Sequence, residues 1–289
     1  MIAHILFETS LPIIQKNTRQ VKDEFDYAYK ENSGKLPLRI SRICIKINTM
    51  EIQIAVAKIN KYASSDSGDT IEIVERPNGG ISAVIADGQS SGRGAKASST
   101  MVVRKVLSLL AEGVRDGAAA RAASDNLYTE KDGKVTACLS ILSVDLETGT
   151  IVVTRNSPTP VYVAYQDKID KISSDSKPIG TSRNIRPSIS EFTLRCGTTI
   201  VLFTDGLIFA GERYGLEMNV GTLMECMLEE MEPSAQYMAD NILAEAMRLD
   251  QNRPNDDISV VVLRVLPDAS DEVRRMVVRL PVPPLLRPN

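Results

Sequence analysis

The 289-residue sequence predicts a layered α+β domain built from antiparallel strands. Segments typical of strands come in consecutive runs, and segments typical of helices come in pairs, whereas βαβ units would alternate regularly. A strong turn signal, Pro-Asn-Gly-Gly at residues 77–80, also joins two apolar segments in the manner of a hairpin. Both observations argue against a doubly wound parallel sheet.

The expected elements follow from the spacing of apolar residues. Helices are expected where these residues recur at helical spacing, at 102–114, 118–127, 220–231 and 234–249. Gly117 would end the first helix and Ser234 would cap the last. β-branched runs between turn residues predict strands at 52–57, 71–75, 81–86, 136–145, 150–155, 160–165, 188–194, 199–204 and 258–265.

The two ends of the chain differ in composition from its centre. Residues 1–36 are expected to form an N-terminal helical extension, either packed on the body or loosely ordered, with a partner-binding helix as the alternative. Residues 37–267 would form the main domain. Residues 268–289 would add a C-terminal edge strand, at 272–280, and a Pro-rich tail.

The bulk composition excludes several functional classes. A net charge of -3 gives no broad attraction to nucleic acid or to an anionic membrane. No apolar stretch approaches the roughly 20 residues of a membrane span, and a signal-peptide pattern is absent, so we expect a cytoplasmic protein. The single histidine, His4, excludes zinc sites with two histidines and disfavours a Ser-His-Asp triad. Four cysteines without CxxC spacing predict buried free thiols.

Acidic residues stand at the tips of three apolar runs. Asp87 follows the run 81–85, Asp205 follows 199–203, and the pair Asp256-Asp257 precedes 258–263. A carboxylate at the tip of a buried strand needs a positive partner. We therefore expect the three tips to converge on a hard divalent cation, which prefers oxygen ligands. Adjacent strand residues face opposite ways, so only one of Asp256 and Asp257 should enter the site.

The glycine-containing loop 87–96 admits several interpretations. It lies between a predicted strand and a predicted helix, but it does not fit the Walker pattern and matches the Rossmann pattern only loosely. A plain structural turn is a second possibility. Metal binding is favoured, because Gly88 would let its carbonyl approach an ion beside Asp87. Arg93 in this loop is either a solvated charge or a contact for substrate phosphate.

Six short motifs occur in a characteristic order. They are Ser-Gly-Asp at 67–69, Ala-Asp-Gly at 86–88, Thr-Arg-Asn-Ser-Pro at 154–158, Lys-Pro-Ile-Gly at 177–180, Phe-Thr-Asp-Gly at 203–206 and Asp-Asp-Ile-Ser at 256–259. Together they resemble the metal-dependent PPM-type serine/threonine phosphatases of the bacterial SpoIIE/RsbU/RsbX branch, over residues 51–266. The resemblance implies two stacked antiparallel β-sheets flanked by helices in a four-layer αββα arrangement.

The resemblance also implies roles for individual residues. Asp87 would bridge two Mn²⁺ or Mg²⁺ ions, the Gly88 carbonyl would bind one of them, and Asp205 and Asp256 would bind the other. Asp69 would hold metal-bound water rather than ligate directly. Asp87, Asp205 and Asp256 would thus be the catalytic set. The upstream arginine and the histidine of larger relatives have no counterpart that can be assigned, so the general acid stays open.

The implied activity is hydrolysis of phosphoserine or phosphothreonine by a metal-activated hydroxide. By resemblance, the substrate would be a phosphorylated STAS-domain protein, such as an anti-anti-sigma factor or a stressosome-like regulator in a partner-switching pathway. No nucleic-acid or membrane partner is expected. The alternative is a catalytically silent pseudophosphatase that serves as a scaffold. Retention of the three acidic tips argues for the enzyme.

Overall fold

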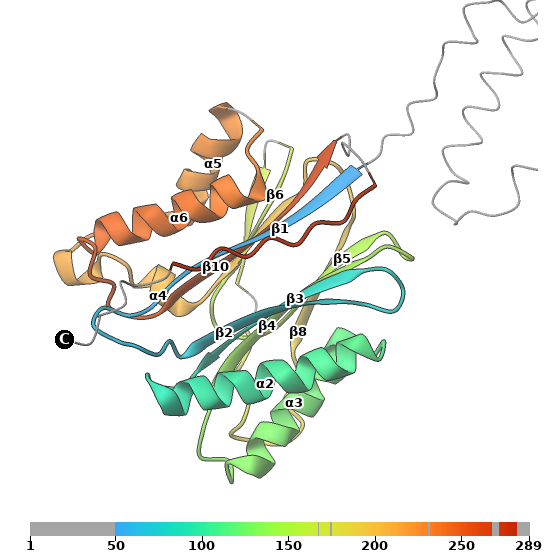
Figure 1. Ribbon diagram of the computed structural model, residues 1–289, viewed down its shortest axis with the longest axis vertical. Coiled ribbons are helices and arrows are strands. Elements are labelled where there is room, and N and C mark those ends of the chain that lie inside the picture. Colours follow the sequence, from blue (N-terminus) through green and yellow to red (C-terminus); the bar gives the residue numbers. More distant parts are fainter. Residues whose placement is uncertain (1–49, 167, 174, 231, 268–271, 282–289) are drawn as a thin grey trace, which may run out of the picture.

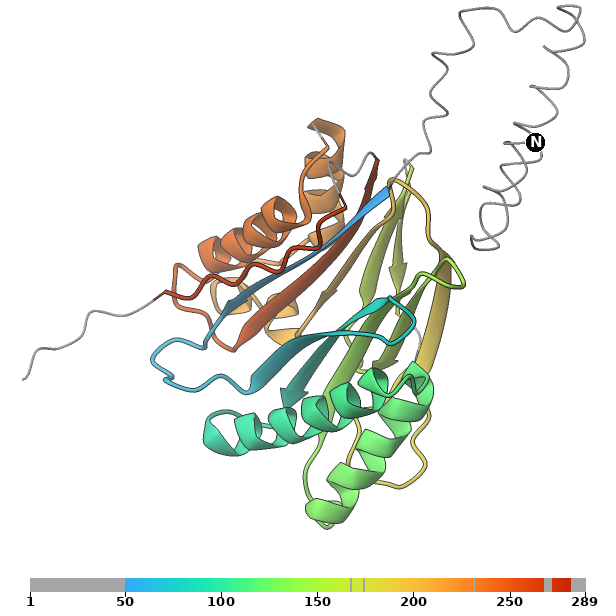
Figure 2. The same cartoon turned by 45° about the vertical axis from the view of Figure 1, so that its right-hand side comes forward.

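The chain folds into two stacked antiparallel sheets that are covered by helices on their outer faces (Figures 1 and 2). The computed structural model describes residues 50–166, 168–173, 175–230, 232–267 and 272–281. Within these ranges each sheet has five strands, in the orders β1-β10-β9-β6-β7 and β2-β3-β4-β5-β8. This four-layer αββα arrangement confirms the predicted fold class. The expected extension at residues 1–36 lies outside the described residues.

The first sheet lies under helices α5 (Val220–Glu230) and α6 (Ala235–Leu249). Its strands are β1 (Met50–Ile59), β10 (Ile258–Pro267), β9 (Thr199–Phe203), β6 (Val161–Tyr165) and β7 (Lys168–Ile172). Met224, Met238 and Ile242 are buried against the outer face of this sheet. The predicted cap of α6 is confirmed, because the Ser234 hydroxyl accepts a hydrogen bond from the Tyr237 N–H at 3.1 Å.

Helices α2 (Arg93–Ala111) and α3 (Asp116–Glu130) cover the outer face of the second sheet. Its strands are β2 (Asp69–Glu75), β3 (Ile81–Gly88), β4 (Ala137–Asp145), β5 (Thr150–Asn156) and β8 (Ser188–Thr193). Alternation along β3 divides its side chains between two layers. Val84 and Ala86 pack against α2 and α3, whereas Ala83 and Ile85 face the other sheet.

A third apolar cluster fills the space between the sheets. Ile85, Leu142 and Val153 of the second sheet are buried in it with Leu202 and Leu263 of the first. Packing of two sheets in this way fixes the ends of their strands relative to one another. The edge at which β3 and β9 end, and at which β2 and β10 begin, therefore gathers residues that are far apart in sequence (Figure 1).

Some element boundaries differ from the sequence prediction. Helix α2 starts at Arg93 and is complete at Ala111, and Gly113, at φ +83°, follows its end. Gly117 is the second residue of α3, so its predicted role as a helix stop is wrong. Strand β7, helix α4 (Asp205–Ile208) and the short 3₁₀ helix Glu212–Tyr214 were not predicted.

The expected edge strand at residues 272–280 is not formed. The described residues 272–281 belong to neither sheet, and Val277, Val278 and Leu280 are 75%, 85% and 82% exposed. The segment contacts the body through a side chain instead, since Arg274 Nη2 donates to the Gly79 carbonyl at 3.3 Å. A β-branched sequence alone was therefore a poor guide here, because strand formation depends on cross-strand packing.

The cysteines agree with the sequence prediction only in part. Cys138, Cys196 and Cys226 are free thiols, as expected, whereas Cys44 lies outside the described residues. Cys196 and Cys226 are exposed, so the expectation of buried thiols is wrong for these two, whereas Cys138 is half-buried and agrees with it in part. None of the helices within the described ranges is long and apolar enough to cross a membrane.

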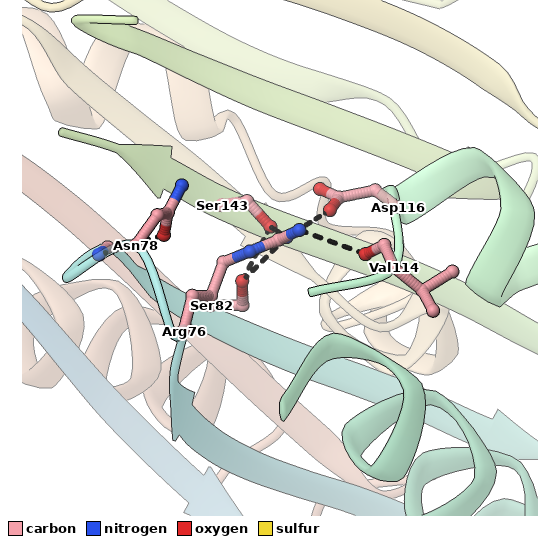
Figure 3. Close-up of polar contacts among 7 residues, drawn as sticks. Arg76, Asn78, Ser82, Val114, Asp116 and Ser143 are labelled. Atoms are coloured by element: carbon pink, nitrogen blue, oxygen red, sulfur yellow. Dashed lines mark hydrogen bonds and ion pairs between the residues drawn. The ribbon is translucent and has the colours of Figure 1, made fainter. Parts of the chain in front are cut away.

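A buried arginine ties the β2–β3 hairpin to the start of α3 (Figure 3). Arg76 Nη1 donates to the Asp116 carboxylate, and Arg76 Nη2 donates to the Val114 carbonyl at 2.9 Å. The Ser82 and Ser143 hydroxyls lie 3.4 Å from the same guanidinium. Because both charged side chains are about nine-tenths buried, each depends on the other to compensate its lost hydration.

Replacing Arg76 with Ala is expected to lower the free energy of unfolding by about 3 kcal/mol, because it leaves the Asp116 carboxylate buried without its partner. Arg274→Ala is the control, since its ion pair with Glu75 is more than half exposed. That control should cost less than about 1 kcal/mol. Urea unfolding of the two variants measures the difference. Equal losses would contradict a structural role for the Arg76 cluster.

Candidate metal centre

Four carboxylates from the predicted motifs meet at one edge of the two sheets. Asp69 begins β2 and lies directly opposite Asp87 near the end of β3. Asp205 follows β9 as the first residue of α4, and Asp256 precedes β10. The strand tips are joined there, because the Thr204 N–H donates to the Ser259 carbonyl at 3.0 Å. The fold thus brings together the acidic tips that the sequence predicted to converge.

The electrostatics of this edge show how closely the carboxylates interact. Burial, followed by the negative charges of Asp69, Asp205 and Asp256 in that order, raises the pKa of Asp87 from 3.8 to about 8. The pKa of Asp205 is also raised, first by burial and then by Asp256. Desolvated carboxylates that repel one another require a cation to stay ionised at neutral pH.

The donor set fits a hard divalent ion. All the side-chain ligands on offer are carboxylate oxygens, which suit Mg²⁺ and Mn²⁺. Among the described residues, no three Asp, Glu, Cys or His side chains are placed closely enough to hold a metal ion together in the metal-free fold. Ion binding would therefore draw these side chains inward from positions at which they already interact.

The neighbours Asp256 and Asp257 have different environments. Asp257 is 4% exposed, and its two carboxylate oxygens accept hydrogen bonds from the Lys61 N–H at 2.9 Å and the Gly68 N–H at 2.7 Å. Asp257 therefore holds the β1–β2 loop in place. Asp256 interacts electrostatically with both Asp87 and Asp205, whereas the charge of Asp257 acts on Asp69. The opposite facing of adjacent residues, expected from the sequence, agrees with this division.

Two hydroxyl groups from the first sheet hold the Asp69 carboxylate of the second. Asp69 Oδ2 accepts hydrogen bonds from Thr204 Oγ1 at 2.9 Å and from Ser259 Oγ at 2.6 Å. Burial raises the pKa of Asp69 and these two hydroxyls lower it, with a net pKa of about 6. The sequence prediction missed both hydroxyl groups. A usable signal existed, because each hydroxyl lies within the same motif as a predicted ligand.

Two lysines at the site were also missed by the sequence prediction. Lys58 Nζ and Lys96 Nζ both donate to the main-chain carbonyl of Asp69, at 2.7 and 2.8 Å. Burial lowers the pKa of Lys58, and the charge of Lys96 lowers it further. The two ammonium groups bring positive charge next to the carboxylates, on strand β1 and helix α2, where no short motif marks them.

The glycines of the two Asp-Gly motifs are required by close packing. A Cβ atom on Gly88 would lie 2.2 Å from the Ala95 carbonyl oxygen, and one on Gly206 would lie 2.2 Å from the Asp257 carbonyl oxygen. Neither position can hold a larger residue without displacing the backbone. Gly88 thus lets the start of α2 approach β3, and Gly206 lets α4 approach the loop that carries Asp256.

A small cavity lies behind Asp87 and Asp205. Its volume is about 10 Å³, room for one water, and its lining includes Cys138, Ser157 and Thr159. Burial, followed by the charge of Asp87, raises the pKa of the Cys138 thiol to about 12, so this thiol stays protonated at neutral pH.

The motifs at residues 154–158 and 177–180 pack around this cavity and hold its lining in place. Arg155 is 1% exposed and donates to the Thr159 carbonyl, and Asn156 Nδ2 donates to the Lys177 carbonyl at 3.3 Å. Ile179 forms a bridge with Ala137 at the start of β4. These contacts give Arg155 and Asn156 a structural role.

A sequence profile of the family described as Stage II sporulation protein E (SpoIIE) matches residues 77–266, about two thirds of the chain. The chain belongs to the SpoIIE family. It is 22% identical over 200 residues to Stage II sporulation protein E of Bacillus subtilis (strain 168). That match covers 69% of this chain but 24% of the relative, so the chain spans about a quarter of that protein's length.

Solved structures show the same fold. The PP2C phosphatase domain of SpoIIE from Bacillus subtilis, solved with a fragment of its regulatory domain, superposes with a TM-score of 0.65 at 22% identity, covering 77% of this chain and 65% of that one. The catalytic domain of the serine/threonine phosphatase PstP with two manganese ions gives 0.59 at 15% identity, covering 75% and 100%. RsbX with magnesium gives 0.58 at 16% identity, covering 76% and 100%.

These matches confirm the predicted SpoIIE family and the predicted fold, which this chain shares with solved PP2C-type phosphatase domains. The structures that contain manganese or magnesium agree with the expected dependence of this class on metal.

Proposed function

We propose that this chain is a metal-dependent phosphoprotein phosphatase that hydrolyses phosphoserine and phosphothreonine. The observation that carries the proposal is the meeting of Asp69, Asp87, Asp205 and Asp256 at one edge of a SpoIIE-family fold, with burial and mutual repulsion raising the pKa of Asp87 to about 8. Such a set is costly without a cation, and a phosphatase of this class uses one.

The proposed ligands follow the environments of the side chains. Asp87 would bridge two ions, the Gly88 carbonyl and Asp87 would hold one, and Asp205 and Asp256 would hold the other. Asp256 is preferred to Asp257 because both oxygens of Asp257 already accept main-chain N–H groups. When bound, two Mn²⁺ or Mg²⁺ ions supply charge neutralisation for phosphate and a water of lowered pKa.

Asp69 is proposed as a positioning residue for water. Its Oδ2 is held by the Thr204 and Ser259 hydroxyls, and in the metal-free fold its carboxylate also shares a side-chain hydrogen bond with Asp87. Once Asp87 holds an ion instead, the Asp69 carboxylate would accept a hydrogen bond from a water at the site. Lys58 and Lys96 hold the Asp69 main chain from two directions and so limit its movement. The restriction keeps this acceptor fixed while the side chains of the other acids adjust to the ions.

The proposed substrate is a phosphorylated STAS-domain protein, of the anti-anti-sigma or stressosome-like kind, in a cytoplasmic partner-switching pathway. Membership of the SpoIIE family and the fold shared with RsbX support this choice. The phosphatase would oppose a serine kinase that acts on the same substrate.

Hydrolysis of p-nitrophenyl phosphate tests the phosphatase directly. Turnover is expected with Mn²⁺ and should fall to background in chelator or in Asp205→Asn, because both changes remove charge neutralisation at the site. Asp240→Asn is the matched control, since Asp240 is an exposed carboxylate on α6 and should leave turnover unchanged. A folded protein that binds Mn²⁺ and hydrolyses neither this ester nor a phosphorylated STAS protein would contradict the proposal and support a scaffold.

A further inference from the structure

An open groove runs along helix α2 next to the candidate metal centre. Its volume is about 620 Å³, and it is lined by Asp66, Arg93, Lys96, Ala97, Thr100, Met101 and Arg104. The helical residues among them recur at spacings of three and four, so they share one face of α2. The opposite face of the helix is used for packing, since Ala95, Val102 and Val106 are buried.

The groove is basic although the chain as a whole carries a net charge of -3. Three cationic residues line it against one acid, Asp66. Arg93 is 95% exposed, and its Nε lies 3.7 Å from Asp66 in a weak surface pair. Arg104 is exposed about three helical turns further along the same face of α2. Local positive charge of this kind attracts acidic groups even when the whole protein does not.

Lys96 connects the groove to the metal centre. Its Nζ donates to the Asp69 carbonyl at 2.8 Å and to Thr70 Oγ1 at 2.9 Å. The groove therefore begins beside a residue of the centre and extends away along α2 through Thr100 and Arg104. A polypeptide whose phosphorylated residue lay at the centre could place its neighbouring residues here. Ala97 and Met101 would contact their aliphatic parts.

We propose that this groove binds acidic residues that flank the phosphorylated residue of the protein substrate. The proposal rests on the proposed phosphatase function for its placement of the phosphate. Charge complementarity selects this occupant, because Arg93 and Arg104 are available to carboxylates. An acidic ligand would also replace Asp66 as the partner of Arg93, so Asp66 acts as a competitor for the groove.

The test measures binding and turnover separately. Two short fluorescent phosphoserine peptides are compared, one with flanking Asp and Glu residues and one with Gln and Ser in their place. Fluorescence anisotropy in Mn²⁺ gives the Kd of each, and phosphate release gives KM. Arg93→Glu combined with Arg104→Glu should weaken binding of the acidic peptide about tenfold. The neutral peptide and p-nitrophenyl phosphate should change less than about twofold.

Two further variants sharpen the test. Arg121→Glu, on an exposed residue of α3 outside the groove, makes the same kind of charge change and should leave both peptides unaffected. Asp66→Asn should tighten binding of the acidic peptide by about twofold to threefold, because it removes the competing carboxylate. Added salt should weaken the acidic peptide more than the neutral one.

The outcomes separate this inference from the proposed function. The proposal for the groove would be overturned if wild type bound the two peptides equally well. It would also be overturned if Arg121→Glu weakened binding of the acidic peptide as much as the Arg93→Glu and Arg104→Glu changes do, even if phosphate is released. Binding of the acidic peptide that depends on Arg93 and Arg104, without any phosphate release, would support the groove and contradict the phosphatase.

Discussion

Asp256→Asn is expected to lower Mn²⁺-dependent hydrolysis of p-nitrophenyl phosphate by about a thousandfold, because losing charge neutralisation worth several kcal/mol changes a rate by that factor. Asp257→Asn, one residue further along, is expected to act on stability instead. The contrast follows from their surroundings. Asp256 contributes its charge to Asp87 and Asp205, whereas Asp257 contributes acceptors to main-chain N–H groups.

The Asp256 variant should fold normally. Half-buried Asp256 shares the charged edge with Asp87, and removing one of several repelling carboxylates relieves strain in the metal-free state. Its Oδ1 accepts a hydrogen bond from the Asp257 N–H at 2.9 Å, and the asparagine oxygen can keep that bond. Calorimetric titration with Mn²⁺ should show weaker binding, while the thermal midpoint without metal stays equal to that of wild type or rises.

The Asp257 variant should lose about 2 kcal/mol of unfolding free energy, because an amide nitrogen cannot accept the N–H bond that a carboxylate oxygen accepts. One of the Lys61 and Gly68 N–H groups is then left without its partner. Residual turnover at low temperature should exceed that of Asp256→Asn. If Asp257→Asn abolished Mn²⁺ binding in a stable protein, the assignment of the two residues would be reversed.

The sequence predicted that the acidic strand ends converge, because the signal for that convergence is local. Asp87 and Asp205 stand at the ends of apolar runs. A charged side chain at the end of a buried strand needs a partner of opposite charge, whatever the fold. The choice between Asp256 and Asp257 could not be made from such runs. It depends on the Gly68 N–H, which lies 189 positions away in the chain and reaches Asp257 because β1 pairs with β10, with Ile59 opposite Ile258.

The start of α2 shows the same limit for the fold. Its first turns contain small residues instead of large apolar ones, so the helical spacing begins only at Val102. The packing explains this, because Ala95, Ser98 and Ser99 are buried where the helix comes close to β2 and β3. Close contact between backbones selects small side chains, and small side chains give little hydrophobic periodicity. Lys96 was missed for the same reason.

Removing metal is expected to destabilise the protein at alkaline pH far more than at acidic pH. In the metal-free fold the pKa of Asp87 is raised from 3.8 to about 8, so the folded state holds this proton where the unfolded chain releases it. The contribution of this Asp87 proton to the free energy of unfolding is complete below about pH 4 and is lost as the pH rises through about 8. Between about pH 5 and 8.5 the loss is on the order of 4 kcal/mol.

Thermal unfolding in chelator should therefore show a midpoint lower by about 10 °C near pH 8.5 than near pH 5. Saturating Mn²⁺ should restore most of that difference, because it binds the deprotonated carboxylates of the folded state. Asp87→Asn provides the control. Without the titrating group, the metal-free variant should lose most of this pH dependence and be more stable than metal-free wild type near pH 8.5.

The Asp87→Asn control makes a distinctive prediction, because replacing this proposed catalytic residue would stabilise the metal-free protein and also remove its response to Mn²⁺. Such a result would mean that the fold holds Asp87 in an environment that is unfavourable for its charge until a cation arrives. If the midpoints of metal-free wild type and Asp87→Asn followed pH identically, the carboxylates at this edge would not be coupled, and the metal centre would have to be sought elsewhere.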